Sequence, residues 1–351
     1  MNTDIHDRIE KECAESVYGS VQALSALKGQ SVFITGGTGF VGIWIAALVS
    51  FLNDNHGFNT NLTLLARNTY AFSEKAPHLA RRKDIVLIGK DVRDPLEISE
   101  EVTFVIHAAA NPDNRQHVLE SLKVMDVIVK GTRSILSSAL QLPYLKKILN
   151  ISSGLIYGGQ PMELDALPET FIGGPDCNSS ASVYAEAKRY AETICSAYRS
   201  LYKLPIVVAR PFAFIGPYQS LDKPWAINNF IRDALRNNPI RIIGNGTPVR
   251  SYMYPSDMAV WLLRLLGDGK PGLAYNLGSP YGISLKELAE KVKEHANSKS
   301  EIIIKHMNED TSKFIPDVRL AKELGLNITV NNDETIRRSI DWFKNSSGLS
   351  Q

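Results

Sequence analysis

The chain has 351 residues, of which 44% are hydrophobic and 22% charged, so it can bury a large core in one or two domains and is not disordered. Its net charge of +2 comes from 39 basic and 37 acidic residues without a basic stripe, which argues against a nucleic-acid or membrane partner. Three cysteines without metal-ligand spacing argue against disulfides and a metal site, and the lack of a leader or membrane-spanning stretch predicts a cytoplasmic protein.

The first half of the chain alternates apolar strands with helices. Residues 1–27 are expected to form a polar helical extension used for packing or a dimer contact. Next come a buried strand at 31–34, a glycine-rich turn and an apolar helix at 41–52. Further apolar runs lie at 62–65, 85–88, 104–106, 148–151 and 206–209, with helices between them at 118–141 and 184–202. This pattern predicts an α/β fold, a Rossmann-like doubly wound parallel sheet with helices on both faces.

After Pro211 the alternation ends, and a smaller C-terminal α/β lobe is expected. Its predicted helices span 227–236, 284–296 and 334–343, and a short strand spans 241–243. We assign residues 28–210 to the dinucleotide-binding domain, 251–278 to a segment that returns to it, and 211–250 with 279–345 to the smaller lobe. The cleft between two such lobes is the natural ligand site.

The turn after the first strand reads TGGTGFVG over residues 35–42, the context of a dinucleotide site. Gly36 permits a tight turn, Gly39 lets the backbone approach a pyrophosphate, and Gly42 is expected to let the helix pack on the strand. The helix N-terminus would then hold phosphate. Predicted contacts of a nicotinamide cofactor in this turn are Gly36, Thr38, Gly39, Phe40, Val41 and Gly42.

The second strand ends on Arg67, where an NAD site usually has an acid for the ribose hydroxyls. An arginine there can pair with a 2′-phosphate or lie over the adenine, so NADP(H) is favoured, NAD(H) stays possible, and a solvated surface side chain is the alternative. The other expected cofactor contacts follow later strands and helices: Asp91, Val92, Ala108, Ala109, Ala110, Ser152, Tyr184, Lys188, Pro211 and Phe212.

The candidate chemical groups are Ser153, Tyr184 and Lys188. The tyrosine and lysine are four residues apart on one helix face, where the ammonium should lower the pKa of the phenol. Tyr184 would exchange a proton with a sugar hydroxyl or carbonyl while hydride moves to or from nicotinamide. Ser153 follows the fifth strand and would hydrogen-bond the reacting oxygen; the alternative is a turn or helix cap.

Seven segments carry a resemblance to a known family: TGGTGFVG, the Asp91 turn, HAAA, SSGLIYG, YAEAK, RPFAFIGP and GNGTPVRSYMYPSD. They resemble the extended short-chain dehydrogenase/reductases, a family of nucleotide-sugar epimerases, dehydratases, decarboxylases and reductases, from about Lys28 to Phe343. The resemblance implies a nucleotide-sugar lobe, catalytic roles for the three groups above, and a homodimer through helices 118–141 and 184–202. Expected substrate contacts are Ser153, Gly154, Tyr184, Asn229, Arg250 on the diphosphate, and Tyr252.

The sequence departs from that family at four positions. Dehydratases carry Asp-Glu directly after the Ser/Thr, and decarboxylases carry Glu two residues before the Tyr of the YG pair, but here those places are Gly154 and Leu155. Neither side chain can transfer a proton, so both reactions fall in rank. The family's two Asn near the site are Ile128 and Ala213, which points to an unusual sugar geometry.

What remains is chemistry that needs only Tyr, Ser, Lys and cofactor. Arg67 favours reduction of a 4-keto-6-deoxyhexose on a nucleotide diphosphate, such as dTDP-4-dehydro-6-deoxyglucose, by family analogy. The alternative is NAD-dependent C4 epimerisation, and a remote one is a non-catalytic cofactor sensor. Of the histidines near the cleft, His107 is interpreted as packing and His117 as a substrate contact.

Overall fold

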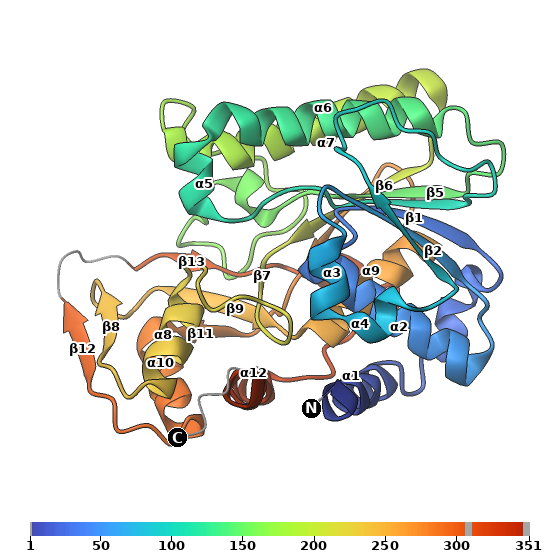
Figure 1. The fold of residues 1–351 in the computed structure, drawn as a ribbon. Coiled ribbons are helices and arrows are strands. Elements are labelled where there is room, and N and C mark those ends of the chain that lie inside the picture. Colours follow the sequence, from blue (N-terminus) through green and yellow to red (C-terminus); the bar gives the residue numbers. More distant parts are fainter. Residues whose placement is uncertain (1, 306–310, 347–351) are drawn as a thin grey trace.

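The structure is a computed structural model that describes residues 2–305 and 311–346. Its centre is a parallel sheet of seven strands in the order β10-β6-β5-β4-β1-β2-β3 (Figure 1). The strands are β1 (Ser31–Thr35), β2 (Asn61–Ala66), β3 (Ile85–Gly89), β4 (Phe104–His107), β5 (Lys147–Ile151), β6 (Ile206–Pro211) and β10 (Ala274–Leu277). The order runs outward from β1 in both directions, so β1 and β4 flank the switch point at which such sheets bind ligands. The predicted Rossmann-like fold is confirmed.

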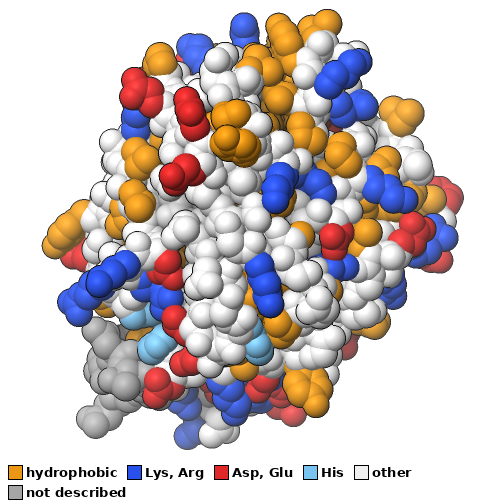
Figure 2. Space-filling view, turned by 90° about the vertical axis from the view of Figure 1, so that its right-hand side faces the viewer, with side chains coloured by type: hydrophobic (Ala, Val, Ile, Leu, Met, Phe, Trp, Pro, Cys, Tyr) orange, Lys and Arg blue, Asp and Glu red, His pale blue; other side chains and the backbone are white. Residues whose placement is uncertain are grey.

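Helices cover both faces of this sheet. On one face lie α6 (Ser121–Ala139) and α7 (Val183–Tyr202), and on the other α2 (Phe40–His56) and α9 (Pro255–Asp268), while α3 (Tyr70–Lys75) and α4 (Pro77–Ala80) link β2 to β3. The helix predicted over 118–141 is interrupted, because Glu120 leaves the helical region with φ −127° and ψ 39° and separates α5 (Asn114–Leu119) from α6. Figure 2 shows hydrophobic side chains gathered at the top of the molecule, over the ends of α6 and α7.

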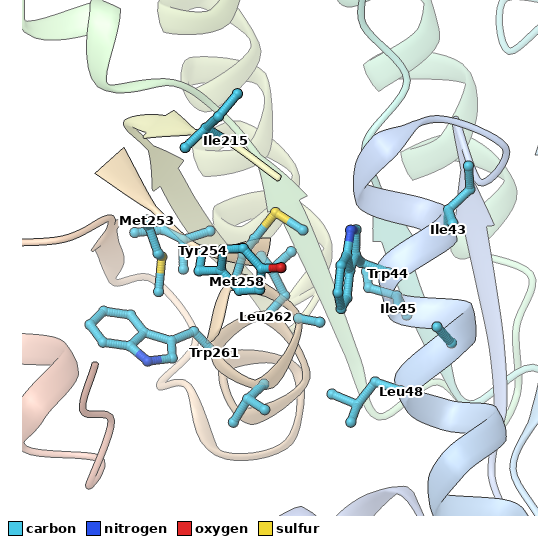
Figure 3. Close-up of a cluster of buried hydrophobic side chains, with 14 of the residues drawn as sticks. Ile43, Trp44, Ile45, Leu48, Ile215, Met253, Tyr254, Met258, Trp261 and Leu262 are labelled. Atoms are coloured by element: carbon cyan, nitrogen blue, oxygen red, sulfur yellow. The ribbon is translucent and has the colours of Figure 1, made fainter. Parts of the chain in front are cut away.

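The interface between α2 and α9 is the apolar centre of the molecule (Figure 3). Trp44 and Leu48 of α2 lie toward Met258 and Leu262 of α9, and all four are buried. The indole Nε1 of Trp44 donates to the Pro217 carbonyl at 3.1 Å, so its one polar atom is satisfied inside this core. Helix α9 comes from the second half of the chain, and this contact fixes it against the helix that follows the glycine turn.

The smaller lobe is built on short strands and on helices of 4 to 15 residues. β7 (Ala213–Phe214), β9 (Val249–Met253), β11 (Gly282–Ser284) and β13 (Lys313–Phe314) form one sheet, and β8 (Ile240–Ile243) pairs with β12 (Ile302–Lys305). The lobe's helices are α8 (Ala226–Leu235), α10 (Leu285–His295), α11 (Arg319–Lys322) and α12 (Asn332–Ser346). The segment predicted to return to the dinucleotide-binding domain, residues 251–278, begins within β9 of the smaller sheet, contains α9 and includes β10 of the seven-stranded sheet.

The N-terminal extension forms α1 (Asn2–Ser16) and a 3₁₀ helix, η1 (Val21–Leu27), and packs on both parts of the chain. Ile9 of α1 is buried in the core. Arg8 donates to the Arg338 carbonyl at 2.7 Å, and the Tyr254 hydroxyl donates to Glu12 at 2.9 Å. The extension therefore connects α9 and α12. Within residues 2–305 and 311–346, no helix has the length and apolarity to cross a membrane.

Candidate active site

The glycine turn leaves β1 at Thr35 and enters α2 at Phe40. Gly36 has φ 69°, the left-handed region, and a Cβ there would lie 2.9 Å from the Ala108 carbonyl oxygen. A Cβ on Gly42 would overlap the Gly37 carbonyl, so Gly42 packs against the turn itself and not against the strand as predicted. The first N–H groups of α2 have no carbonyl partner within the helix and are available to phosphate.

A buried hydrogen-bond chain holds the loop opposite this turn. The Thr132 hydroxyl donates to the Ile128 carbonyl at 2.7 Å, so it accepts from Nε2 of His107 at 3.1 Å. Nδ1 of His107 is then the acceptor for the Thr35 hydroxyl at 2.7 Å, and that oxygen accepts from the N–H groups of Ala108 and Ala109. Burial lowers the pKa of His107 to about 3, which fits this neutral tautomer. His107 is a packing residue, as interpreted, and also an anchor for the loop.

Ser153, Tyr184 and Lys188 come together at the carboxyl edge of the sheet. Ser153 follows β5 and precedes the 3₁₀ turn η2 (Gly154–Tyr157), while Tyr184 and Lys188 lie on the first turns of α7. The Ser153 side chain acts on the pKa of the Tyr184 hydroxyl, and the Lys188 ammonium is 5.9 Å from the Tyr184 ring centroid. The Ser153 hydroxyl also accepts from the Leu155 N–H at 3.2 Å and so caps η2. The same hydroxyl acts on Tyr184.

Burial sets the charge state of this group. It raises the pKa of Tyr184 to about 12, against the opposing effect of the Ser153 hydrogen bond, and lowers the pKa of Lys188 to about 8. The expected lowering of the tyrosine pKa by lysine is wrong for this structure, because the Lys188 ammonium is itself desolvated and donates to the Ile151 carbonyl at 2.6 Å. Tyr184 is therefore protonated near neutral pH and holds a proton that it can donate.

The position after Ser153 is closed to a larger side chain by Phe212. A Cβ on Gly154 would lie 2.9 Å from Cε2 of Phe212. The Phe212 ring is held in turn by Phe314 and Tyr157, with ring centroids 4.8 and 6.3 Å away. An acidic side chain at 154 would require this aromatic cluster to move. Pro211, the other cofactor contact predicted here, ends β6.

At the nucleotide end, Arg67 is exposed directly after β2. Asp91 is already paired with Arg93, whose guanidinium is 2.8 Å away and lowers the pKa of that carboxyl to about 2. Sequence reasoning missed this partner, although it is only two residues away. Val92 is buried and packs against Gly131 of α6, so its side chain belongs to the core.

The predicted substrate contacts of the smaller lobe lie on two elements. Arg250 on β9 donates to the carbonyl and the hydroxyl of Ser312, at 3.1 and 3.0 Å, and Tyr252 on the same strand is buried. Asn229 on α8 is half-buried, whereas its neighbour Asn228 is fully buried. The contacts described for these residues do not reach the Ser-Tyr-Lys group, so their roles stay predictions.

Asp113, which precedes α5, and His117, on α5, have partners that the sequence did not show. Asp113 caps α5 and accepts from Arg115 at 2.8 Å and from Lys223 of the smaller lobe at 3.1 Å. His117 stacks on Tyr184, and its expected contact with substrate stays a prediction. The cap sequence Asp113-Asn114-Arg115 was the available signal. In the part of the chain described, no group of three or more metal-binding side chains occurs.

The parallel sheet, the glycine turn and the Ser-Tyr-Lys group define a dinucleotide-binding oxidoreductase class. Residues 32–278 match the NAD dependent epimerase/dehydratase family, and the chain belongs to that family, within the extended short-chain dehydrogenase/reductases. Similar curated proteins include UDP-glucuronic acid decarboxylase 3 of Arabidopsis thaliana, 32% identical over 84% of this chain and 82% of the relative. UDP-glucuronic acid decarboxylase 1 of Xenopus tropicalis is 27% identical over 93% of this chain and 75% of the relative.

Solved structures share the fold. UDP-glucose 4-epimerase of Thermotoga maritima has a TM-score of 0.77 at 23% identity and covers 91% of this chain and 100% of its own. dTDP-glucose 4,6-dehydratase of Bacillus anthracis, in complex with NAD, has a TM-score of 0.77 at 20% identity and covers 91% and 98%. The family is one of enzymes, which speaks against a cofactor sensor. Its stated cofactor is NAD, and the expected preference for NADP(H) gains no support from it.

The contact between Gly154 and Phe212 can be tested by adding one methyl group. Gly154→Ala is expected to lose about 1–3 kcal/mol of unfolding free energy, because the methyl would press on a ring that its neighbours hold. Gly159→Ala is the matched control, since a Cβ there meets nothing within 4 Å. Urea denaturation of both variants measures the difference, and equal midpoints would contradict the packing argument.

The buried His107 should make the protein sensitive to acid. Its native pKa of about 3 lies below the roughly 6.5 of an unfolded chain, so on acidification the unfolded state takes up a proton that the native state refuses. The unfolding free energy should therefore fall as the pH drops from about 6.5 toward 3. In His107→Asn this fall should be shallower, whatever the variant's stability at neutral pH.

The measurement is a series of urea denaturations across that pH range. Substitution of the exposed His56 by Asn is the control and should leave the slope unchanged. Parallel pH curves for the wild type and His107→Asn would show that the buried imidazole is not the source of the sensitivity.

Proposed function

We propose that this enzyme transfers hydride between a nicotinamide cofactor and C4 of a nucleotide-diphosphate sugar, and that it reduces a 4-keto-6-deoxyhexose such as dTDP-4-dehydro-6-deoxyglucose. The observation that carries the proposal is the buried Ser153–Tyr184 hydroxyl pair beside Lys188, with no acid or base at Gly154 or Leu155. Such a group can move one proton at one carbonyl. Elimination and decarboxylation need a further proton-transferring side chain that these two positions lack.

The residues at the sheet edge fit a dinucleotide. The turn at Gly36 and the start of α2 offer N–H groups to phosphate, and the buried hydroxyl of Ser152 has no protein partner among the described residues. Ser152, Gly36, Gly39 and Phe40 would line the binding site. The nicotinamide cofactor supplies the hydride when bound.

The chain's own residues then handle the proton. The Ser153 hydroxyl would donate a hydrogen bond to the sugar C4 oxygen and hold it within reach of Tyr184. Tyr184, protonated near neutral pH, would give its proton to that oxygen as the carbonyl becomes an alcohol. As Tyr184 gives up its proton, negative charge develops on the phenol oxygen, and the positive charge of Lys188 would stabilise it. A protonated tyrosine is the form that reduction requires, which supports the proposed direction.

C4 epimerisation is the second candidate. It uses the same three residues, first to oxidise C4 and then to reduce it from the other face. Two of the matched structures are UDP-glucose 4-epimerases, and one is in complex with NAD. An epimerase would retain its cofactor and interconvert UDP-glucose and UDP-galactose with none added, whereas a reductase consumes reduced cofactor in step with the ketone.

The central test is Tyr184→Phe with the 4-keto sugar and NADPH or NADH. Removal of the phenol oxygen is expected to lower kcat about 10²- to 10⁴-fold, the usual range for a general acid. Cofactor affinity should stay near that of the wild type. Tyr202→Phe is the control on the same helix, since Tyr202 is exposed. An active Tyr184→Phe enzyme would exclude the proposal, and epimerisation without added cofactor would favour the second candidate.

We also propose a homodimer formed through α5, α6 and α7. Val118, Leu119, Leu122 and Tyr190 expose more than half of their surface on these neighbouring helices. Apolar groups gathered on one face mark an interaction surface. Leu122→Arg is expected to shift the protein to a monomer in light scattering, whereas Ile243→Arg, on an exposed residue of β8, should not. A monomeric wild type would contradict the proposed dimer.

The cytoplasmic location expected from the sequence stays a prediction.

A further inference from the structure

The imidazole of His117 lies face to face with the phenol ring of Tyr184. The ring centroids are 4.4 Å apart and the planes differ by 7°. His117 is on α5, which contacts α7, and only 4% of its surface is exposed. A close, nearly parallel pair of buried rings restricts the motion of both. The tyrosine that carries the proposed chemistry is therefore held on one face by a residue outside the Ser-Tyr-Lys group.

The orientation of the His117 ring is fixed independently of Tyr184. Its Nε2 is 2.8 Å from the Asn111 carbonyl, and because a carbonyl only accepts, Nε2 carries the hydrogen. The turn that presents this carbonyl is itself fixed, since the Asp113 N–H donates to the Asn111 side chain at 3.0 Å and Asp113 caps α5. The imidazole is thus a prearranged surface against which the phenol ring lies.

Burial, and not the neighbouring charges, favours the neutral form of the His117 ring. Burial lowers its pKa, against the opposing effects of the Asn111 carbonyl and the Asp113 carboxylate. Asp113 is itself neutralised by Arg115 and by Lys223 of the smaller lobe. Lys188 is on the tyrosine's own helix. The contact between the two rings is therefore one of shape and stacking between uncharged groups.

We propose that His117 is a positioning residue that holds the Tyr184 phenol against Ser153 by ring stacking; this rests on the proposed role of Tyr184 as the acid. Proton transfer requires the phenol oxygen within hydrogen-bond reach of the sugar oxygen. A displacement of about 1 Å at such a site can cost about 10²-fold in rate. A ring that can stack should keep the geometry, and a side chain without a ring should lose it.

The test compares His117→Ala with His117→Phe in the full chain with cofactor and the 4-keto sugar. We expect His117→Ala to lower kcat about 10- to 100-fold, while the KM of the sugar nucleotide and the affinity for cofactor stay within about 2-fold. His117→Phe keeps a stacking ring and should recover most of the loss. Asn114→Ala, on an exposed residue of the same helix, is the control.

Wild-type kcat in His117→Ala, or equal losses in the Ala and Phe variants with unchanged urea midpoints, would overturn the proposal. A second readout does not need turnover: the NMR resonance of Tyr184 in protein labelled at the tyrosine ζ-carbon, assigned by its loss in Tyr184→Phe. It should move clearly in His117→Ala and less in His117→Phe, and no movement in His117→Ala would count against the stack. A wild type that turns over no sugar nucleotide, with this NMR response intact, would overturn the proposed function instead.

Discussion

Helix α9 packs along α2 largely through apolar side chains, among them Trp44, Leu48, Met258 and Leu262, and the geometry of the site depends on this contact. The N-terminus of α2 is the glycine turn, and the N-terminus of α9 follows directly on β9, the strand that carries Arg250. One buried interface therefore sets the distance between the dinucleotide end of the cleft and the strand of the smaller lobe. Because buried apolar contacts are dense and resist deformation, that distance is held firmly.

Burial raises the pKa of the acid in the site and lowers the pKa of the bases, and both shifts favour the uncharged forms. Burial makes the Tyr184 phenol a weaker acid and makes the Lys188 amine and the His107 imidazole weaker bases. Each group is thereby moved toward its uncharged form. The carboxylates that stay charged nearby, Asp91 and Asp113, are paired with arginines at the rim. At neutral pH the Tyr184 phenol and the His107 imidazole are thus uncharged, whereas Lys188, with a pKa of about 8, still carries most of its positive charge beside the phenol.

Much of the fold follows from local pattern. The apolar runs from β1 to β6 alternate with helices and allow almost only a parallel sheet, and such a sheet brings Ser153 after β5 to the same edge as the glycine turn after β1. The spacing of Tyr184 and Lys188 places both on one face of α7. What these patterns cannot give is the direction in which a side chain turns once its neighbours are packed.

The sequence predictions therefore failed where the outcome depends on tertiary contacts. The Lys188 amine donates to a carbonyl of β5, which helical spacing does not reveal. His117 stacks on a residue far along the chain, although its own surroundings look like an ordinary short helix. The break between α5 and α6 comes from the non-helical backbone angles of Glu120, although the apolar periodicity of the sequence continues on both sides.

The packing of the Phe212 ring over Gly154 limits which side chains position 154 can take. A side chain at position 154 would press on the Phe212 ring and require it to shift, and a smaller residue at 212 would leave a void beside Phe314 and Tyr157. Either order of mutation passes through a less stable protein. The effects of substitutions at positions 154 and 212 on stability should therefore not be additive.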